Sequence, residues 1–187
     1  MLVGNGMAGM RTLEELLKLA PDKYAITVFG AEPHPNYNRI LLSPVLTGEK
    51  QFSEIVLNDD AWYAEHGITL HKGKTVIEIN RRNRRVKAAD GTTAAYDRLL
   101  LATGSNPFLL PVPGKDLPGV IGFRDFADVE TMLAAARQYR HAVVIGGGLL
   151  GLEAANGLMK QGMKVTVVHL PDALMERQLD APAAKML

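Results

Sequence analysis

The sequence predicts an α/β fold that contains two βαβ units, with a β-meander between them. A glycine pattern occurs twice, as "VGNGMAG" at residues 3–9 and as "IGGGLLG" at residues 145–151. A short apolar run precedes each copy, and a segment with apolar residues at helical spacing follows it. Between the copies, residues 68–102 alternate with period two in short runs, a pattern typical of antiparallel strands.

The elements of the first unit are expected in the order strand, turn, helix, strand. We expect a strand over residues 1–3, a helix over 10–20 and a strand over 24–30, because Pro21 and Asp22 stop the helix. The prolines of residues 31–50 exclude a long regular element there, and a short helix is expected over 58–67.

The second unit repeats this order after a proline-rich stretch. Residues 104–122 contain Pro107, Pro111, Pro113 and Pro118, which predicts a stiff crossing and a domain boundary between residues 112 and 113. A helix over 125–139 follows, with Asp125 or Asp128 as its expected cap. We then expect a strand over 141–146, a helix over 152–162 and a strand over 164–170. The two predicted domains are therefore residues 1–112 and 113–187.

Composition excludes several classes of function. The 187 residues carry 21 basic and 20 acidic side chains, a net charge of +1, which gives no field for nucleic acid or an anionic membrane. No apolar run of about 18 residues could span a bilayer, and no signal-like segment is present, so a cytoplasmic location is expected. The chain has no cysteine, which excludes disulfides, thiolate metal sites and a cysteine nucleophile within it.

Four arginines flank Asn83 at one turn of the expected meander: Arg81, Arg82, Arg84 and Arg85. A nucleic-acid patch is one interpretation. We favour a solvated hairpin edge, because no aromatic residues are interleaved with the arginines.

The glycine pattern G-x-G-x-x-G after a strand and before a helix predicts a site for a dinucleotide pyrophosphate. The first glycine allows the tight turn, the second leaves room for the phosphates, and the third lets the helix pack close to the strand. These positions are Gly4, Gly6 and Gly9 in the first copy and Gly146, Gly148 and Gly151 in the second.

The residue that ends the second strand of such a unit reads the adenosine ribose. In the first unit this residue is Glu32, whose carboxylate suits ribose hydroxyls; in the second the corresponding residue is His169. We favour NADH over NADPH, because Gly151 fills the third glycine position and no arginine directly follows the strand. The alternative is that His169 merely ends a strand.

With both turns placed, "LLLATGS" at residues 99–105 completes a set of motifs that resembles the two-dinucleotide-binding FAD/NAD(P)H flavoprotein reductases. Within them the chain is most similar to the N-terminal part of assimilatory nitrite reductase [NAD(P)H] large subunits. The match is carried by "GNGMAGMRTLEELL", "YNRILLSPVL", "YDRLLLATGS", "VIGGGLLGLEAA" and "LMERQLD". The resemblance implies a glutathione-reductase-like three-layer fold, with an FAD-binding domain first and an NAD(P)H-binding domain second, both truncated here.

The resemblance also implies roles for individual residues. The FAD pyrophosphate would lie on the first glycine turn, and the adenosine ribose would contact the glutamate that follows the second strand. The adenine would contact the backbone of a valine. The remainder of the cofactor would lie along the "YNR" segment and the "ATG" strand. These residues are Gly4, Gly6, Met7, Ala8, Gly9, Glu32, Asn38, Arg39, Ser43, Val76, Ala102, Thr103 and Gly104. For the nicotinamide cofactor they are Gly146, Gly148, Leu149, Leu150, Gly151, Glu153 and His169, with Glu153 near the stack of nicotinamide on flavin or, alternatively, a helix-surface carboxylate.

The implied reaction needs no catalytic side chain and no metal ligand from this chain. Hydride would pass from NADH to FAD, and electrons would continue to iron–sulfur and sirohaem centres in a downstream region absent from this sequence. The partners expected are those redox domains or a small subunit, and a homodimer is possible. As a piece of a longer reductase, the chain is expected to be inactive alone and to hold FAD weakly.

Two alternative functions remain open. The first is an NADH-dependent ferredoxin or rubredoxin reductase, although relatives of that kind commonly have a lysine where this chain has Pro44 after Ser43. The second is a dinucleotide-binding module without turnover.

Overall fold

The computed structural model describes all residues, 1–187. The chain divides into two compact units, one of residues 1–38 and 55–105 and one of residues 39–54 and 106–187. The expected boundary between residues 112 and 113 therefore differs from the point at which the chain last changes unit. That the first domain binds FAD and the second binds NAD(P)H stays a prediction.

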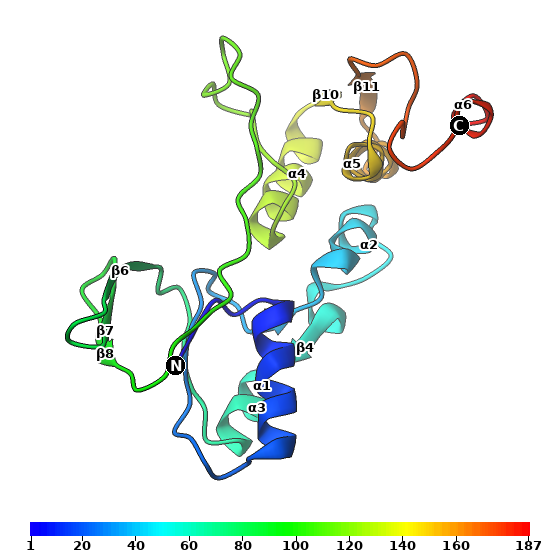
Figure 1. The fold of residues 1–187 in the computed structure, drawn as a ribbon. Coiled ribbons are helices and arrows are strands. Elements are labelled where there is room, and N and C mark those ends of the chain that lie inside the picture. Colours follow the sequence, from blue (N-terminus) through cyan, green and yellow to red (C-terminus); the bar gives the residue numbers. More distant parts are fainter. The chain divides into compact units, whose positions relative to one another are not determined.

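Figure 1 traces the chain by colour from the N-terminus to the C-terminus. A four-stranded parallel sheet forms the centre of the first unit, in the order β5-β2-β1-β9. Its strands are β1 (Leu2–Val3), β2 (Thr27–Phe29), β5 (Thr69–His71) and β9 (Leu100–Leu101). Helix α1 (Met7–Leu19) connects β1 to β2, and α3 (Asp60–Glu65) precedes β5. Asp59 caps α3 by accepting a 2.9 Å hydrogen bond from the backbone N–H of Trp62.

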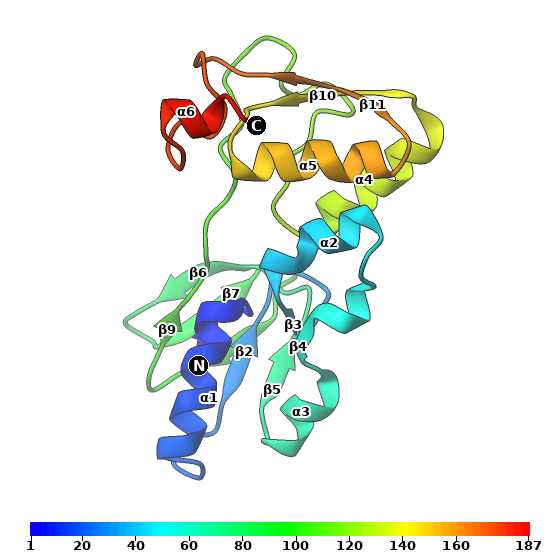
Figure 2. The same ribbon diagram turned by 90° about the vertical axis from the view of Figure 1, so that its right-hand side faces the viewer.

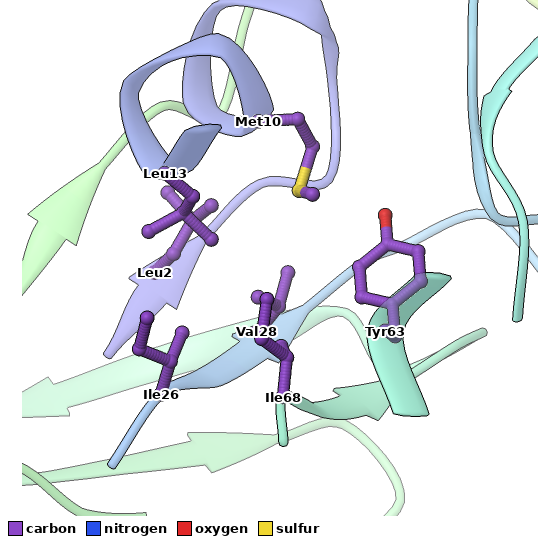
Figure 3. Packing of buried hydrophobic residues seen from close by; sticks show 7 residues of the cluster. All are labelled: Leu2, Met10, Leu13, Ile26, Val28, Tyr63 and Ile68. Atoms are coloured by element: carbon purple, nitrogen blue, oxygen red, sulfur yellow. The ribbon is translucent and has the colours of Figure 1, made fainter. Parts of the chain in front are cut away.

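Successive residues of β1 and β2 point to opposite faces of this sheet, and each face is covered. On one face, side chains of the sheet pack against α1 and α3 (Figure 3), in a cluster of Leu2, Met10, Leu13, Ile26, Val28, Tyr63 and Ile68. On the other face, Val3 and Phe29 pack against Val86 and Ala88 of the meander. The first unit thus has the three layers that the resemblance implied: helices, parallel sheet and meander.

The meander is an antiparallel sheet of β6 (Val76–Asn80), β7 (Arg85–Ala88) and β8 (Thr93–Ala95). We expected antiparallel strands over all of residues 68–102, and this was wrong for the first and the last strand of that range. Residues 69–71 form β5, which pairs in parallel with β2, and residues 100–101 form β9, which pairs in parallel with β1. A separate antiparallel pair joins β3 (Asn36–Tyr37) to β4 (Val56–Asn58).

The second unit is built around α5 (Leu149–Lys160), which lies between a strand pair and a short helix (Figure 2). The strands β10 (His141–Ile145) and β11 (Lys164–Val168) pair in parallel along five residues each. The short helix is α2 (Leu42–Thr47), which follows the 3₁₀ turn η1 (Arg39–Leu41). The other elements are η2 (Phe52–Ile55), α4 (Phe126–Gln138) and α6 (Ala181–Ala184).

Helix α4 begins where the sequence predicted a cap. Asp125 accepts a hydrogen bond from the Asp128 backbone N–H at 3.1 Å, and Asp128 accepts one from the Asp125 N–H at 3.2 Å. Both expected aspartates are therefore used, one as the cap and one as its reciprocal partner. No helix in the structure has the length and apolar character needed to cross a membrane.

Candidate dinucleotide-binding turns

The first glycine turn links β1 to α1 and has a separate steric reason for each glycine. Gly4 has φ +111°, and a Cβ there would lie 2.0 Å from the Ala102 carbonyl oxygen. A Cβ on Gly9 would lie 2.9 Å from the Gly4 oxygen and 3.1 Å from Leu2 Cδ1. Gly4 and Gly9 are thus required by the close approach of the turn, α1 and the end of β9.

Gly6 differs from these two glycines, because no atom lies within 4 Å of the position of its Cβ. It is also the N-cap of α1, where no side chain caps the helix and the first turn contains no acidic residue. The N-terminal N–H groups of α1 therefore lack a side-chain acceptor beside an open space, an arrangement that suits a phosphate group.

Glu32 lies after β2 and is held in place by another side chain. The Tyr37 hydroxyl donates a 2.6 Å hydrogen bond to Glu32 Oε2, and the Glu32 backbone oxygen accepts from Gly73 N–H at 2.9 Å. This half-buried carboxylate keeps a defined orientation. Sequence reasoning did not identify Tyr37, although its place in the "YNR" motif five residues after Glu32 was visible.

The other residues predicted around FAD are divided between the two units. Ala102, Thr103 and Gly104 follow β9 beside Gly4, and the Ala102 N–H donates to the Val3 oxygen at 2.8 Å. Val76 begins β6 and packs against the meander side of the sheet, and Asn38 also lies in the first unit. Arg39 and Ser43 lie in the second unit, where Arg39 Nη1 donates to the Arg124 oxygen at 3.1 Å.

The second glycine turn, between β10 and α5, repeats the geometry of the first. Gly146 has φ +111°, and a Cβ on Gly151 would lie 1.9 Å from the Gly146 oxygen. No atom lies within 4 Å of a Cβ on Gly148, which is the N-cap of α5 and has no side-chain cap. The first residues of α5, Leu149 and Leu150, are exposed.

His169 follows β11 directly and contacts the second turn. Its Nδ1 accepts a 3.0 Å hydrogen bond from the Gly147 N–H, so the proton of the neutral ring is on Nε2. Nε2 lies 3.1 Å from the Ala173 oxygen and 3.2 Å from Glu176 Oε2. Both ring nitrogens therefore have partners within the chain, and the side chain is only 14% exposed.

Strand register shows which residues of the two units are equivalent. Val3 pairs with Phe29 in the first unit, and Ile145 pairs with Val168 in the second. His169 is consequently equivalent to Gly30 rather than to Glu32, which differs from the correspondence expected from sequence spacing. The spacing was misleading because the connections between helix and second strand differ in length.

Glu153 lies in the second turn of α5 and is half-buried against α2. The Ser43 hydroxyl donates a 2.5 Å hydrogen bond to Glu153 Oε2. Farther along the same face of α5, Gln161 Nε2 donates to the Leu46 oxygen at 2.8 Å. Glu153 is therefore held by α2, and its place beside the nicotinamide or as a helix-surface carboxylate stays a prediction.

No group of three or more His, Cys, Asp or Glu side chains is arranged to hold a metal ion. A hollow of about 700 Å³ lies beside the C-terminal half of α1 and α3, lined by Glu14, Leu17, Lys18, Pro21, Asp22, Trp62, Glu65 and His66. None of these is a predicted site residue.

Known proteins resemble this chain along its whole length. Nitrite reductase [NAD(P)H] of Bacillus subtilis (strain 168) is 58% identical over 186 residues, which cover 100% of this chain and 23% of that protein. The assimilatory nitrate reductase electron transfer subunit of the same strain is 51% identical, over 100% of this chain and 24% of that protein. The chain thus spans about a quarter of the length of these curated relatives.

Solved structures confirm the predicted α/β fold with Rossmann-like units. The crystal structure of NADH:rubredoxin oxidoreductase from Clostridium acetobutylicum superimposes with a TM-score of 0.86 at 25% identity, covering 98% of this chain and 47% of that one. The resemblance to nitrite reductase large subunits is confirmed by sequence. The profile of the pyridine nucleotide-disulphide oxidoreductase family matches residues 1–187, and the chain belongs to this family.

Proposed function

We propose that the chain binds FAD at the first glycine turn and NAD(P)H at the second, as the flavin- and nicotinamide-binding part of a nitrite reductase large subunit. The two dinucleotides would supply the redox chemistry, a hydride transfer from NADH to FAD with onward electron transfer to iron–sulfur and sirohaem centres outside this chain. One observation carries the proposal. Both turns combine a helix N-terminus without a side-chain cap and an open second glycine, at Gly6 and at Gly148.

In the first unit, the residues present fit a flavin dinucleotide. The N–H groups of Gly6, Met7 and Ala8 would receive the pyrophosphate at the positive end of α1. Glu32, oriented by Tyr37, would accept the hydroxyl groups of the adenosine ribose. Ala102 and Gly104 would line the path of the cofactor beside Gly4.

In the second unit, the turn fits a second dinucleotide in the same way. Leu149 and Leu150 open α5, so their N–H groups would face the pyrophosphate. We favour NADH because the third glycine is retained at Gly151 and no arginine directly follows β11. His169 would border the ribose through a ring that already binds Gly147.

Ser43 orients Glu153, which we place beside the nicotinamide. The 2.5 Å hydrogen bond from the Ser43 hydroxyl holds one carboxylate oxygen. The other oxygen, Oε1, would accept a hydrogen bond from the nicotinamide amide. Because the chain contains no cysteine, it cannot pass electrons through a disulfide of its own. Its residues bind and orient the cofactors and exclude water, and none acts as a nucleophile.

The partners of this part are proposed to be redox domains or a small subunit of the same reductase, with homodimer formation as a further proposal. The rival function is a reductase of ferredoxin or rubredoxin. Identity of 58% to a nitrite reductase, against 35% to the ferredoxin–NAD(+) reductase component of a biphenyl dioxygenase system, supports the first function. Pro44 stands where ferredoxin and rubredoxin reductases commonly have a lysine, which also supports the nitrite reductase function.

An anaerobic titration tests the proposal. The intact reductase that contains this chain is loaded with FAD, NADH is added, and loss of the visible flavin absorbance is followed. We expect bleaching of this intact protein by one equivalent of NADH. Gly148→Ala should retain FAD but prevent bleaching, whereas Gly6→Ala should prevent FAD binding and retain NADH binding. A bound flavin that NADH leaves oxidised would contradict the reductase function and favour a binding module.

A second step separates the two reductase functions. The reduced protein is mixed with rubredoxin or with a plant-type ferredoxin, and the rate of electron transfer is measured by stopped flow. The nitrite reductase assignment predicts slow transfer that does not saturate with acceptor concentration. Fast, saturable transfer to either acceptor would favour the rival function.

A further inference from the structure

We propose that Tyr63 is a positioning residue for the first glycine turn, and that its hydroxyl holds the Asn5 side chain so that the backbone N–H groups of residues 5–7 keep the orientation needed for a pyrophosphate. Neither residue belongs to the site predicted from sequence. The identity of the ligand rests on the proposed function, whereas the contact itself does not.

The contact between Tyr63 and Asn5 is a partly buried hydrogen bond. The Tyr63 hydroxyl donates to Asn5 Oδ1 at 2.7 Å, and Asn5 Nδ2 makes a longer contact, 3.4 Å, to the His34 oxygen. Tyr63 is 2% exposed, and its ring belongs to the cluster between the sheet and the helices (Figure 3). Burial raises the pKa of Tyr63 to about 12, so the hydroxyl remains a donor at any physiological pH.

The space around Asn5 is closed on the side of β2. A Cβ on Gly30 would lie 2.8 Å from Asn5 Cβ, so the Asn5 side chain lies directly against the Gly30 backbone. The Gly30 N–H donates to the His71 oxygen at 2.9 Å, which fixes that backbone in the sheet. Asn5 is therefore held by packing on one side and by the Tyr63 hydroxyl on the other.

The second turn has the same contact with the residue sizes exchanged. Gly147 is equivalent to Asn5, and His169 is equivalent to Gly30. A Cβ on Gly147 would lie 3.0 Å from His169 Cγ, and the Gly147 N–H donates to His169 Nδ1. In both turns the residue between the first two glycines is thus packed against the residue after the second strand and held by a polar side chain.

This residue is well placed to control phosphate binding. It joins the glycine with positive φ to the open glycine, so rotation of its peptide would turn the N–H groups at the helix N-terminus. Donors that are already aligned lose less freedom when the anion binds, which increases affinity. The ring of Tyr63 contributes to the core, and its hydroxyl contributes to the turn.

The substitution Tyr63→Phe keeps the ring and removes the hydroxyl. We expect the dissociation constant for FAD to rise about tenfold, the effect of one lost hydrogen bond. Amide hydrogen exchange at residues 5–7, measured without FAD, should become faster while exchange in β10 and β11 is unchanged. The matched control is Tyr24→Phe, which removes a hydroxyl from an exposed tyrosine and should change neither quantity.

A double-mutant cycle distinguishes positioning from a general loss of stability. In an Asn5→Ala background, Tyr63→Phe should change FAD affinity by less than about twofold, because the contact is already absent. A tenfold loss that persists in this background, or unchanged exchange at residues 5–7 in Tyr63→Phe, would overturn the proposal. If the intact reductase that contains the unsubstituted chain binds no FAD, the proposed function fails, and the exchange of residues 5–7 still decides the role of Tyr63.

Discussion

Gly4 and Gly6 are two residues apart, yet the structure requires glycine at these positions for different reasons. Gly4 has positive φ and no room for a Cβ beside Ala102, so its side chain is excluded by the protein itself. Gly6 has φ −92° and open space around it, so only a ligand would exclude a side chain. The first glycine serves the fold, and the second serves binding.

Alanine should therefore affect mainly stability at Gly4 and mainly FAD binding at Gly6. We expect Gly4→Ala to lower the free energy of unfolding by more than about 2 kcal/mol, through strain and the clash with Ala102. Gly6→Ala should lower it by no more than about 1 kcal/mol, the cost of a poorer N-cap, while it greatly weakens FAD binding. Urea unfolding and FAD titration measure both effects, and equal stability of the two variants would contradict this explanation.

Tyr63 should make stability fall at alkaline pH. Its pKa is about 12 in the folded protein, against an ordinary value of 10.0, because burial disfavours the phenolate. Between these values the folded state binds more protons than the unfolded state, so the free energy of unfolding decreases as pH rises, by up to about 1.4 kcal/mol per pH unit. Below pH 10 the stabilisation that comes from the neutral Tyr63 side chain is fully present.

In Tyr63→Phe this decrease in stability with pH should be absent. Denaturant unfolding from pH 9 to pH 12 measures it. A decrease of the same slope in Tyr63→Phe would contradict the explanation.

The roles of the glycines could be predicted from sequence because they depend on residues only a few positions apart. The contacts of Asn5 could not, because they join residue 5 to residues 30 and 63. Those contacts depend on the register of β1 against β2 and on the placement of α3. An asparagine between two glycines of the turn was the available signal.

At the scale of elements, α2 shows why sequence reasoning was incomplete. The prolines of residues 31–50 argued against a long helix, and α2 is indeed only six residues long, with Pro44 in its first turn. Proline, which has no backbone N–H, is tolerated there because N–H groups in the first turn of a helix have no acceptor within the helix. Strand β5 was misassigned because period-two alternation does not distinguish a parallel strand from an antiparallel one.

The packing of α2 on α5 depends on Gly157. A Cβ at this position would lie 2.5 Å from both Cγ and Cδ2 of Leu46, whose side chain is fully buried. Glycine-to-alanine changes usually stabilise a helix interior by about 0.5–1 kcal/mol. Here we expect Gly157→Ala to destabilise the second unit by about 1–3 kcal/mol, because the methyl group overpacks this contact.

A second substitution tests that cause. Leu46→Ala alone should also destabilise the protein, since it leaves a cavity. Together, Gly157→Ala and Leu46→Ala should cost less than the sum of their separate effects, because each relieves the defect made by the other. Additive effects in thermal or urea unfolding would show that the two residues do not interact.

At the scale of the whole molecule, one face of the β10–β11 pair is covered by α5 and the other is exposed. The exposed face carries Val143, Ile145 and Val168, which are 65%, 62% and 51% exposed. Exposed apolar side chains that lie together on a strand pair favour contact with other apolar molecules.

We therefore expect this chain to enhance the fluorescence of the dye ANS while it is folded. Val143→Thr with Ile145→Thr should reduce the enhancement by about half or more, at little cost in stability, because threonine suits an exposed strand. The matched control is Val165→Thr with Val167→Thr, on the covered face, which should lower stability instead. Equal ANS fluorescence in the parent chain and in the first variant would contradict the assignment of the patch.

Because residues 39–54 belong to the second unit, the chain passes between the units after residues 38, 54 and 105. No single cut of the polypeptide can release either unit whole. During synthesis α2 emerges well before its partner, since Ser43 precedes Glu153 by 110 residues. At about 5–20 residues per second, the ribosome leaves α2 without α5 for roughly 5–20 seconds. During this interval the apolar side chains of Leu42, Val45 and Leu46 lack their native cover and are available to chaperones.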